Sequence, residues 1–161
     1  MTTTKQQTKG FTIIEVVLVL AIAAFIFLMI FIAWPALQRS QRDDARKHDA
    51  QIVASAIGSW RSNHNGKNPL SATDFTAFKT NYLSDLSQYD RTSATEVVLG
   101  NGTTTFPVAT KFSVMNINMG TKCDTATNKS TTTGASSRQA SIVILVESGD
   151  PTNGVLFCQD A

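Results

Sequence analysis

The sequence predicts an α+β fold in which a long N-terminal α-helix packs on a small antiparallel β-sheet. Two observations support this prediction. An unbroken apolar run near the start is followed by a polar stretch and then by apolar residues at helical spacing, which favours one helix over residues 11–63. Beyond that helix, short β-type segments separated by turn residues favour a sheet. With 161 residues, the chain is long enough for one domain besides the apolar segment.

The first ten residues, MTTTKQQTKG, form a short, polar and basic leader. An uncharged apolar run, Val16–Trp34, follows it. A helix over that run spans roughly 28 Å, which is close to the hydrocarbon thickness of a bilayer. Because lipid offers the backbone no hydrogen bonds, the run is predicted to be one transmembrane helix. Lys5 and Lys9 favour a cytoplasmic N-terminus.

Glu15 is a lone carboxylate at the front of this apolar segment. An ionisable side chain costs about 2.5–3.5 kcal/mol at the centre of a bilayer and less near its interface, so it marks a function by default. A position in the headgroup zone is the alternative explanation. The order of the residues around Glu15 favours a functional role for this side chain. A leader with lysines is followed by Gly10, by Phe11 and then by Thr-Ile-Ile-Glu before the apolar helix.

This N-terminus resembles the class III signal of type IV prepilins, in which glycine precedes the cut, an aromatic residue follows it and glutamate is fifth after it. Gly10, Phe11 and Glu15 occupy those places. The resemblance implies the lollipop fold of type IV pilins, cleavage of the Gly10–Phe11 bond and methylation of the new amine of Phe11. It also implies that Glu15 pairs with the Phe11 ammonium of a neighbouring subunit and so sets the register of assembly.

Three segments are expected: a prepilin leader over 1–10, the transmembrane and filament-core half of the helix over 11–35, and a soluble head over 36–161. The head includes the second half of the helix and the sheet. Pro35 is expected to kink or loosen the helix where the apolar run ends.

The second half of the helix begins with a polar stretch over residues 38–51. Pairs four residues apart, Arg39–Asp43 and Asp43–Lys47, favour a solvated helix. This stretch also contains a basic cluster, which consists of Arg39, Arg42, Arg46 and Lys47. The cluster is interpreted as part of a solvated helix face, and ion pairing between subunits is the alternative. An apolar stripe then follows at helical spacing: Ile52, Val53, Ala56, Ile57 and Trp60. Asn65-Gly66 is expected to end the helix.

A short second helix is expected over residues 71–86, with Thr73 as its cap. Its apolar residues are interpreted as core: Phe75, Phe78, Tyr82 and Leu83. Five β-type segments follow: Ala94–Leu99, Thr104–Thr110, Lys111–Asn118, Ser141–Glu147 and Val155–Cys158. Asn101-Gly102 is a hairpin signal between the first two.

Two patterns predict how these strands are buried. Alternation in Lys111–Asn118 predicts a half-buried antiparallel strand, whereas the continuous apolar run Ile142–Val146 predicts a central one. Residues 123–141 are rich in Thr and Ser and are predicted to form an exposed loop, with an adhesive or modified surface as the alternative. Asn101 and Asn128 begin glycosylation sequons, which are weak signals.

The chain has two cysteines, Cys123 and Cys158. If the head faces oxidising conditions, a disulfide between them is expected, and two reduced core cysteines are the alternative. There is no C-x-x-C motif and no Cys/His cluster, so no zinc site is predicted.

The formal net charge is +2, and the leader supplies it. Removing Lys5 and Lys9 from the fourteen basic residues leaves twelve, against twelve acidic ones. Nucleic acid is therefore not indicated as a partner by composition, although a local basic patch is not excluded.

The sequence predicts no enzyme, cofactor or metal. His48 and His64 lack the neighbours of a catalytic or metal site, and there is no phosphate-binding loop, dinucleotide fingerprint or G-x-S-x-G motif. Asp150-Pro-Thr-Asn-Gly lacks the carboxylate series of a calcium loop.

The predicted function is structural: a subunit of a type IV pilus that supports surface motility, adhesion or DNA uptake. The resemblance implies several partners: other pilin subunits in a helical homopolymer, prepilin peptidase, the inner-membrane platform and assembly machinery, and the membrane. The chain would cross that membrane once before assembly and lie in an extracellular pilus afterwards. A minor pilin, or a pseudopilin of a type II secretion or competence system, is the near alternative. A single-pass anchored binding domain is the distant one, and it predicts no processing at Gly10–Phe11.

Overall fold

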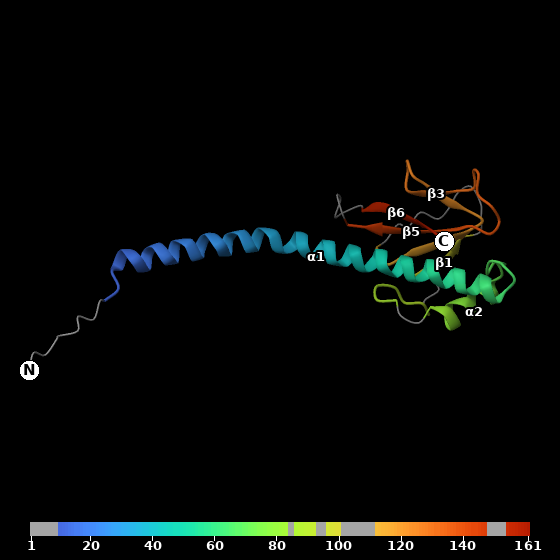
Figure 1. The fold of residues 1–161 in the computed structure, drawn as a ribbon, viewed down its shortest axis with the longest axis horizontal. Helices are drawn as coiled ribbons and strands as arrows, with labels where there is room; N and C mark the ends of the chain where they lie inside the picture. Colours follow the sequence, from blue (N-terminus) through green and yellow to red (C-terminus); the bar gives the residue numbers. More distant parts are fainter. Residues whose placement is uncertain (1–9, 84–85, 93–95, 101–111, 148–153) are drawn as a thin grey trace, which may run out of the picture. The chain divides into compact units, whose positions relative to one another are not determined.

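The computed structural model describes residues 10–83, 86–92, 96–100, 112–147 and 154–161. By its internal contacts the chain divides into two units, Met1–Gln38 and Arg39–Ala161, which are described separately below. The described residues form α1 (Ile13–Asn63), α2 (Ala72–Tyr82), β1 (Val97–Gly100), β2 (Met115–Met119), β3 (Lys122–Asp124), β4 (Lys129–Thr131), β5 (Ala140–Val146) and β6 (Val155–Asp160) (Figure 1). The predicted α+β class, with a long N-terminal helix and a small sheet, is confirmed.

α1 is one helix of 51 residues that continues through Pro35. It begins at Ile13, two residues later than expected, and ends at Asn63. Asn65 and Gly66 then adopt left-handed backbone conformations, with φ of 53° and 75°. The Gly66 N–H donates to the carbonyl oxygen of Arg61 at 2.8 Å, so the predicted Asn-Gly stop closes the helix as a Schellman-type cap.

The main sheet has the strand order β1-β2-β5-β6. β5 pairs antiparallel with both β2 and β6, as predicted, but β1 pairs parallel with β2. The sheet is therefore mixed, and the expectation of an antiparallel sheet is wrong for its β1 edge. Parallel neighbours need a longer return connection than a tight hairpin allows. The expected hairpin at Asn101-Gly102 and the expected strand Thr104–Thr110 lie outside the described residues.

β5 is buried along its whole length, which confirms the central strand predicted from Ile142–Val146. β2 is also completely buried, so the prediction that it is half-buried is wrong. Its polar face is covered by a second layer, because the side-chain amide of Asn118 donates to Ser130 Oγ of β4 at 2.7 Å. A strand that is covered on both faces can still alternate between apolar and polar residues when its polar side chains find buried partners.

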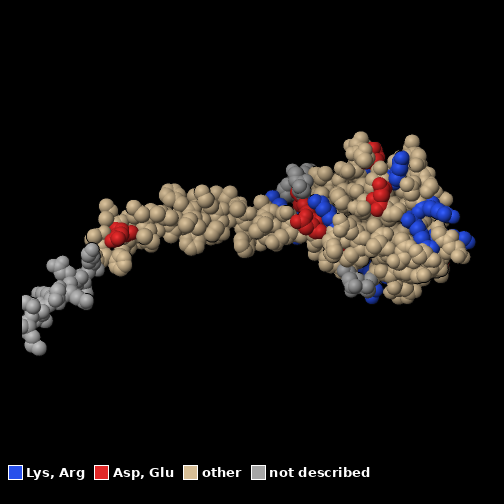
Figure 2. Space-filling model, in the orientation of Figure 1, with Lys and Arg blue, Asp and Glu red and all other residues tan. Residues whose placement is uncertain are grey.

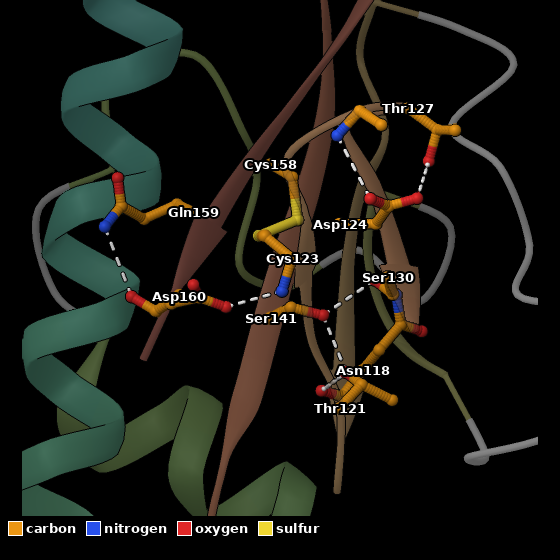
Figure 3. The surroundings of a disulfide bond; sticks show 11 residues. Asn118, Thr121, Cys123, Asp124, Thr127, Ser130, Ser141, Cys158, Gln159 and Asp160 are labelled. Carbon is orange, nitrogen blue, oxygen red and sulfur yellow. Dashed lines mark hydrogen bonds between the residues drawn. A yellow bond between two sulfur atoms is a disulfide. The ribbon is translucent and has the colours of Figure 1, made fainter. Parts of the chain in front are cut away.

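The prediction of an exposed loop over residues 123–141 is wrong for the antiparallel pair β3 and β4, whereas residues 132–139 lie outside the strands and are mostly exposed, as predicted. Hydroxyl groups hold this hairpin against the main sheet (Figure 3). Ser141 Oγ lies 2.7 Å from Ser130 Oγ and 2.6 Å from Thr121 Oγ1. Some of the Thr and Ser side chains in and beside this segment therefore form a buried hydrogen-bond network. Asn128 lies in the connecting turn with φ of 53°, and the hydroxyl-bearing residue of its sequon, Ser130, is buried.

The core of the head joins the second half of α1, α2 and the main sheet. The predicted stripe of α1 is buried at Val53, Ala56, Ile57 and Trp60, while Ile52 is half-buried. α2 lies beside this part of α1 (Figure 1). It is capped by Ser71, whose Oγ accepts from the Asp74 N–H at 3.0 Å, and not by Thr73 as expected.

The aromatic residues of α2 are core residues, as predicted. Phe75, Phe78 and Leu83 are buried, and Tyr82 is half-buried. The indole ring of Trp60 makes edge contacts with Phe78 and Tyr82 at centroid distances of 6.0 and 5.4 Å. These ring contacts lock α2 onto α1.

Tyr89 provides a test of this core. Its side chain is 4% exposed, and its hydroxyl has no hydrogen-bond partner among the described residues. Burial raises the pKa of Tyr89 above its usual range. We expect Tyr89→Phe to raise the free energy of unfolding by up to about 1–2 kcal/mol, because it removes an unsatisfied buried hydroxyl and keeps the ring. Denaturant unfolding of the full chain in non-ionic detergent measures this change.

Tyr82→Phe is the matched control. Its hydroxyl accepts from Asn63 Nδ2 at 2.8 Å, so the same chemical change should lower stability by about 0.5–1 kcal/mol. A loss at Tyr89→Phe as large as the loss in this control would contradict the prediction.

Candidate functional site

The predicted cleavage site lies in exposed, non-helical backbone. Gly10 and Phe11 precede the first residue of α1, and the Phe11 side chain is 87% exposed. The carbonyl and N–H groups of the Gly10–Phe11 bond are therefore outside the helical hydrogen-bond ladder. A peptide bond in this state is open to an enzyme that binds extended chain.

Glu15 has local hydrogen-bond partners at the start of α1. Its Oε2 accepts from the Thr12 N–H at 3.4 Å and from Thr12 Oγ1 at 3.3 Å. This is the reach-back half of a capping box, and it explains why the helix begins at Ile13. Sequence analysis missed the role of Thr12, although the Thr-x-x-Glu pattern is a known helix-start signal. The expected pairing of Glu15 with a neighbouring Phe11 ammonium stays a prediction.

Behind Glu15, the apolar side chains of α1 face outward. The large ones between Phe11 and Leu37 are all exposed, from 47% at Ile30 to 87% at Phe11. Within the described part of the chain, α1 is the helix that is long and apolar enough to cross a membrane. A continuous apolar surface of this size needs lipid or another apolar partner.

In the head, a charge cluster joins α1 to the end of β5. Arg42 forms a bidentate pair with Glu147, with Nε–Oε1 and Nη2–Oε2 distances of 3.0 and 2.6 Å. Arg46 Nη1 lies 3.0 Å from Glu147 Oε1 and 3.1 Å from Asp43 Oδ1. Asp43 Oδ1 also accepts from the Glu147 N–H at 2.7 Å. We name these four residues the helix anchor: Arg42, Asp43, Arg46 and Glu147.

The helix anchor corrects the interpretation of residues 38–51 as a solvated helix. Asp43 is 2% exposed, and its partners are Arg46 and Glu147, not Arg39 or Lys47. Glu147 lies 104 residues further along the chain, so local spacing could not reveal it. The hydrogen bonds from Arg42, with a further contribution from Arg46, lower the pKa of Glu147 to about 2.

Asp49 fixes another connection to the same helix. Its side chain is fully buried and accepts from the backbone N–H groups of Ser87 and Gln88 at 3.0 and 2.7 Å, and from Ser87 Oγ at 3.0 Å. These donors satisfy the buried oxygen atoms of Asp49. The segment after α2 is thereby held against α1.

Cys123 and Cys158 form a disulfide with a Cα–Cα distance of 5.7 Å. The bond joins β3 to β6, and Asp160 Oδ1 accepts from the Cys123 N–H at 2.6 Å beside it (Figure 3). These residues belong to unit 39–161, whereas Gly10, Phe11 and Glu15 belong to unit 1–38. The predicted site residues therefore form two separate groups. The disulfide lies in unit 39–161, and the predicted processing and register residues lie in unit 1–38.

Within the described ranges, no group of three or more His, Cys, Asp or Glu side chains is placed to hold a metal. His64 stacks on Trp60 at 3.7 Å and bonds through Nδ1 to the Trp60 carbonyl. Most of the Asp150-Pro-Thr-Asn-Gly segment lies outside the described residues.

Comparison with known proteins identifies the N-terminus. The family model of the prokaryotic N-terminal methylation motif matches residues 5–31. That range contains Gly10, Phe11, Glu15 and most of the exposed apolar run. Neither the curated proteins nor the solved structures give a match to the chain. The chain is therefore prepilin-like, and this resemblance lies in its N-terminal segment.

The helix anchor predicts a pH dependence of stability. Because the folded pKa of Glu147 is about 2 and its ordinary value is 4.5, its ionic contribution is present above pH 4.5 and is lost as the pH falls through 2. We expect Glu147→Gln to lower the free energy of unfolding by about 1–3 kcal/mol at pH 7. The difference from the unmodified chain should shrink between pH 4.5 and 2 in thermal melts.

Asp44→Asn is the control for this pH dependence, because Asp44 is an exposed acid on the same helix. It should change stability by less than about 0.5 kcal/mol at pH 7. A Glu147→Gln effect that is equally small, or that grows toward pH 2, would disprove the role assigned to Glu147.

The disulfide predicts a second stability change. Replacing both cysteines, Cys123→Ser with Cys158→Ser, should lower the free energy of unfolding by about 3–4 kcal/mol, because a loop with a sequence separation of 35 residues is no longer closed in the unfolded chain. Melts of the oxidised and reduced chains measure the same quantity. A reductant should destabilise the unmodified chain and leave the double variant unchanged; equal melting of the oxidised and reduced chains would contradict this account.

Proposed function

We propose that this prepilin-like chain is a structural subunit of a type IV pilus. In this proposal it is cleaved between Gly10 and Phe11, methylated on Phe11 and polymerised through the first half of α1. One observation carries the proposal: the methylation motif over residues 5–31 continues into a helix whose large apolar side chains are exposed. A motif for processing and a surface that requires burial occur together in one segment.

The chain would act in two environments. Before assembly, residues 11–35 cross the cell membrane once, with the leader over 1–10 on the cytoplasmic side. After cleavage by prepilin peptidase, the assembly machinery of the inner-membrane platform moves the helix out of lipid and packs it against other subunits. The apolar surface that lipid covered is then covered by neighbouring helices in an extracellular fibre. The head, residues 36–161, would face the outside.

Glu15 would control register in this assembly. In a dry filament core, a carboxylate without a partner is costly, and the methylated Phe11 ammonium of a neighbour supplies the opposite charge. The hydrogen bonds from Thr12 satisfy part of the carboxylate while the subunit waits in the membrane. Assembly then adds the charge partner that Thr12 cannot provide. A subunit out of register would leave both charges unpaired.

Processing and polymerisation can be tested together by intact-mass and N-terminal analysis of sheared fibres and of membranes. We expect fibres to contain a chain that starts at methylated Phe11 and retains the disulfide. Glu15→Ala should leave cleavage intact and reduce fibre yield at least tenfold, because the register pair is lost. Asp44→Ala, the loss of an exposed acid outside the apolar run, is the control and should assemble normally.

The outcomes of this experiment separate the alternatives. A processed chain that is scarce in fibres but present in membranes would assign it as a minor pilin or pseudopilin. An unprocessed N-terminus would overturn the prepilin function and favour a single-pass anchored domain. Normal fibre yield from Glu15→Ala would disprove the register role of Glu15 alone.

A further inference from the structure

We propose that Asn65 is a site of spontaneous deamidation, and that the cap at the end of α1 restrains the reaction until the turn opens. The reaction converts the side-chain amide of Asn65 into a carboxylate and releases ammonia. Asn65 and the groups that hold it belong to unit 39–161, so this modification does not depend on the structural function proposed above.

The local sequence makes Asn65 reactive. Its side chain is exposed, and the next residue is Gly66. In deamidation, the backbone nitrogen of the following residue attacks the side-chain carbonyl carbon, Cγ. Glycine has no Cβ atom, so nothing on residue 66 itself obstructs that approach. Asn-Gly also occurs at 101–102 and 153–154, but the structure describes both residues of the pair only at 65–66.

The chemical step needs only water. The bond between the Gly66 nitrogen and Asn65 Cγ forms, the Cγ–Nδ2 bond breaks, and ammonia leaves with the proton of the Gly66 nitrogen. The product is a five-membered cyclic imide. Water then opens one of the two imide carbon–nitrogen bonds, which gives aspartate or isoaspartate. No atom is oxidised or reduced in either step.

The cap of α1 opposes ring closure. The Gly66 N–H donates to the carbonyl oxygen of Arg61 at 2.8 Å. An imide nitrogen carries no proton, so this hydrogen bond cannot survive the reaction. The left-handed conformations of Asn65 and Gly66, with φ of 53° and 75°, belong to the same cap. Deamidation in the folded head must therefore break the cap.

Further hydrogen bonds hold the turn on both sides of Asn65. Arg61 Nε donates to Asn68 Oδ1 at 2.7 Å. Asn68 Nδ2 donates to the carbonyl oxygens of Ser137 and Gln139 at 2.9 and 3.3 Å. Asn68 is buried, so this bridge ties the turn to the loop before β5. The rate of deamidation should follow the population of open turn, as hydrogen exchange and proteolysis follow local opening.

Deamidation would add a negative charge to a surface without acidic residues. Residues 61–71 and 132–139 include no Asp or Glu, whereas Lys67 and Arg138 are exposed. The guanidinium carbon of Arg138 lies 3.6 Å from the position that a Cβ atom would take at Gly66. On the face drawn in Figure 2, Lys and Arg side chains gather at the end of the head where α1 finishes. The new carboxylate would therefore lie among cations.

The modified turn would also hold α1 less firmly. A carboxylate at the C-terminal end of a helix interacts unfavourably with the helix dipole. Isoaspartate in addition lengthens the backbone by one carbon atom between Asn65 and Gly66, inside the cap. The hydrogen bond from Gly66 to Arg61 then loses its spacing. Deamidation would thus loosen the end of α1 irreversibly.

Incubation of the full chain in non-ionic detergent at mildly alkaline pH, followed by trypsin digestion and mass spectrometry, tests this proposal. Trypsin releases residues 62–67, and fragmentation separates Asn65 from Asn63. The same sequence as a blocked peptide, Ser-Asn-His-Asn-Gly-Lys, is the unrestrained reference. We expect Asn65 to react at least about tenfold more slowly in the folded chain than in the peptide. In urea-unfolded chain it should react like the peptide.

Asn68→Ala should accelerate the reaction of Asn65 at least about threefold, because it removes the bridge that holds the turn. Asn81→Ala, which removes an exposed asparagine of α2, is the matched control and should leave the rate unchanged. Cys123→Ser with Cys158→Ser separates local opening from global unfolding. It destabilises the whole head without touching the turn, so it should also leave the rate unchanged at a temperature where melts show it folded.

Equal rates in the folded chain and the peptide would overturn the proposal, because the cap would then provide no restraint. This comparison uses the unmodified chain, so it remains decisive even if Asn68→Ala does not fold. A rate in the cysteine double variant that equals the rate in Asn68→Ala would also overturn it, since the reaction would then require global unfolding. Absence of deamidation in the unfolded chain would exclude the site itself. The assay involves neither peptidase nor fibre, so its failure leaves the pilus proposal intact.

Discussion

The head depends on the ion-pair network of Glu147, because this carboxylate joins the end of the central strand to the long helix. It accepts from Arg42 and Arg46, while its own N–H donates to Asp43. Such a network is stabilising only as a complete set, since removing one charge leaves the others partly buried and unpaired. Asp49 makes a corresponding connection to the segment after α2. The polar stretch of α1 is therefore as important for docking the helix as its apolar stripe.

This arrangement explains how one helix can present two different surfaces. In the head, α1 is held by Val53, Ile57 and Trp60 together with the buried carboxylates of Asp43 and Asp49. Before residue 38, it exposes apolar side chains that no described residue covers. The contacts that fold the head lie within unit 39–161, so the proposed exchange of lipid for other subunits concerns only the first half of α1. Under the proposed function, polymerisation would require no refolding of the head.

Local signals in the sequence predicted most of the fold. The apolar run, the stripe ending at Trp60 and the continuous strand around Ile144 each lie within one element, so short windows contain them. The parallel pairing of β1 and the Arg42–Glu147 pair were missed, because both depend on residues distant in sequence. The β3–β4 hairpin was missed for another reason: its serines and threonines resemble a loop until their hydroxyls are paired. At the N-terminus, the family resemblance predicted roles for Gly10, Phe11 and Glu15 that stay predictions, and the helix-capping role of Thr12 could have been predicted from the Thr-x-x-Glu pattern.

The net charge of the chain shows that function, too, can be predicted only in part from the sequence. Without the leader lysines, basic and acidic residues are equal in number, so composition indicates no attraction for nucleic acid. The fold then separates these charges. Asp43 and Glu147 pair with Arg42 and Arg46 where α1 meets β5, whereas Lys67 and Arg138 are exposed. The two carboxylates of the helix anchor are matched by two arginines, so the number of charges in the sequence does not show which of them the fold pairs and which it leaves exposed.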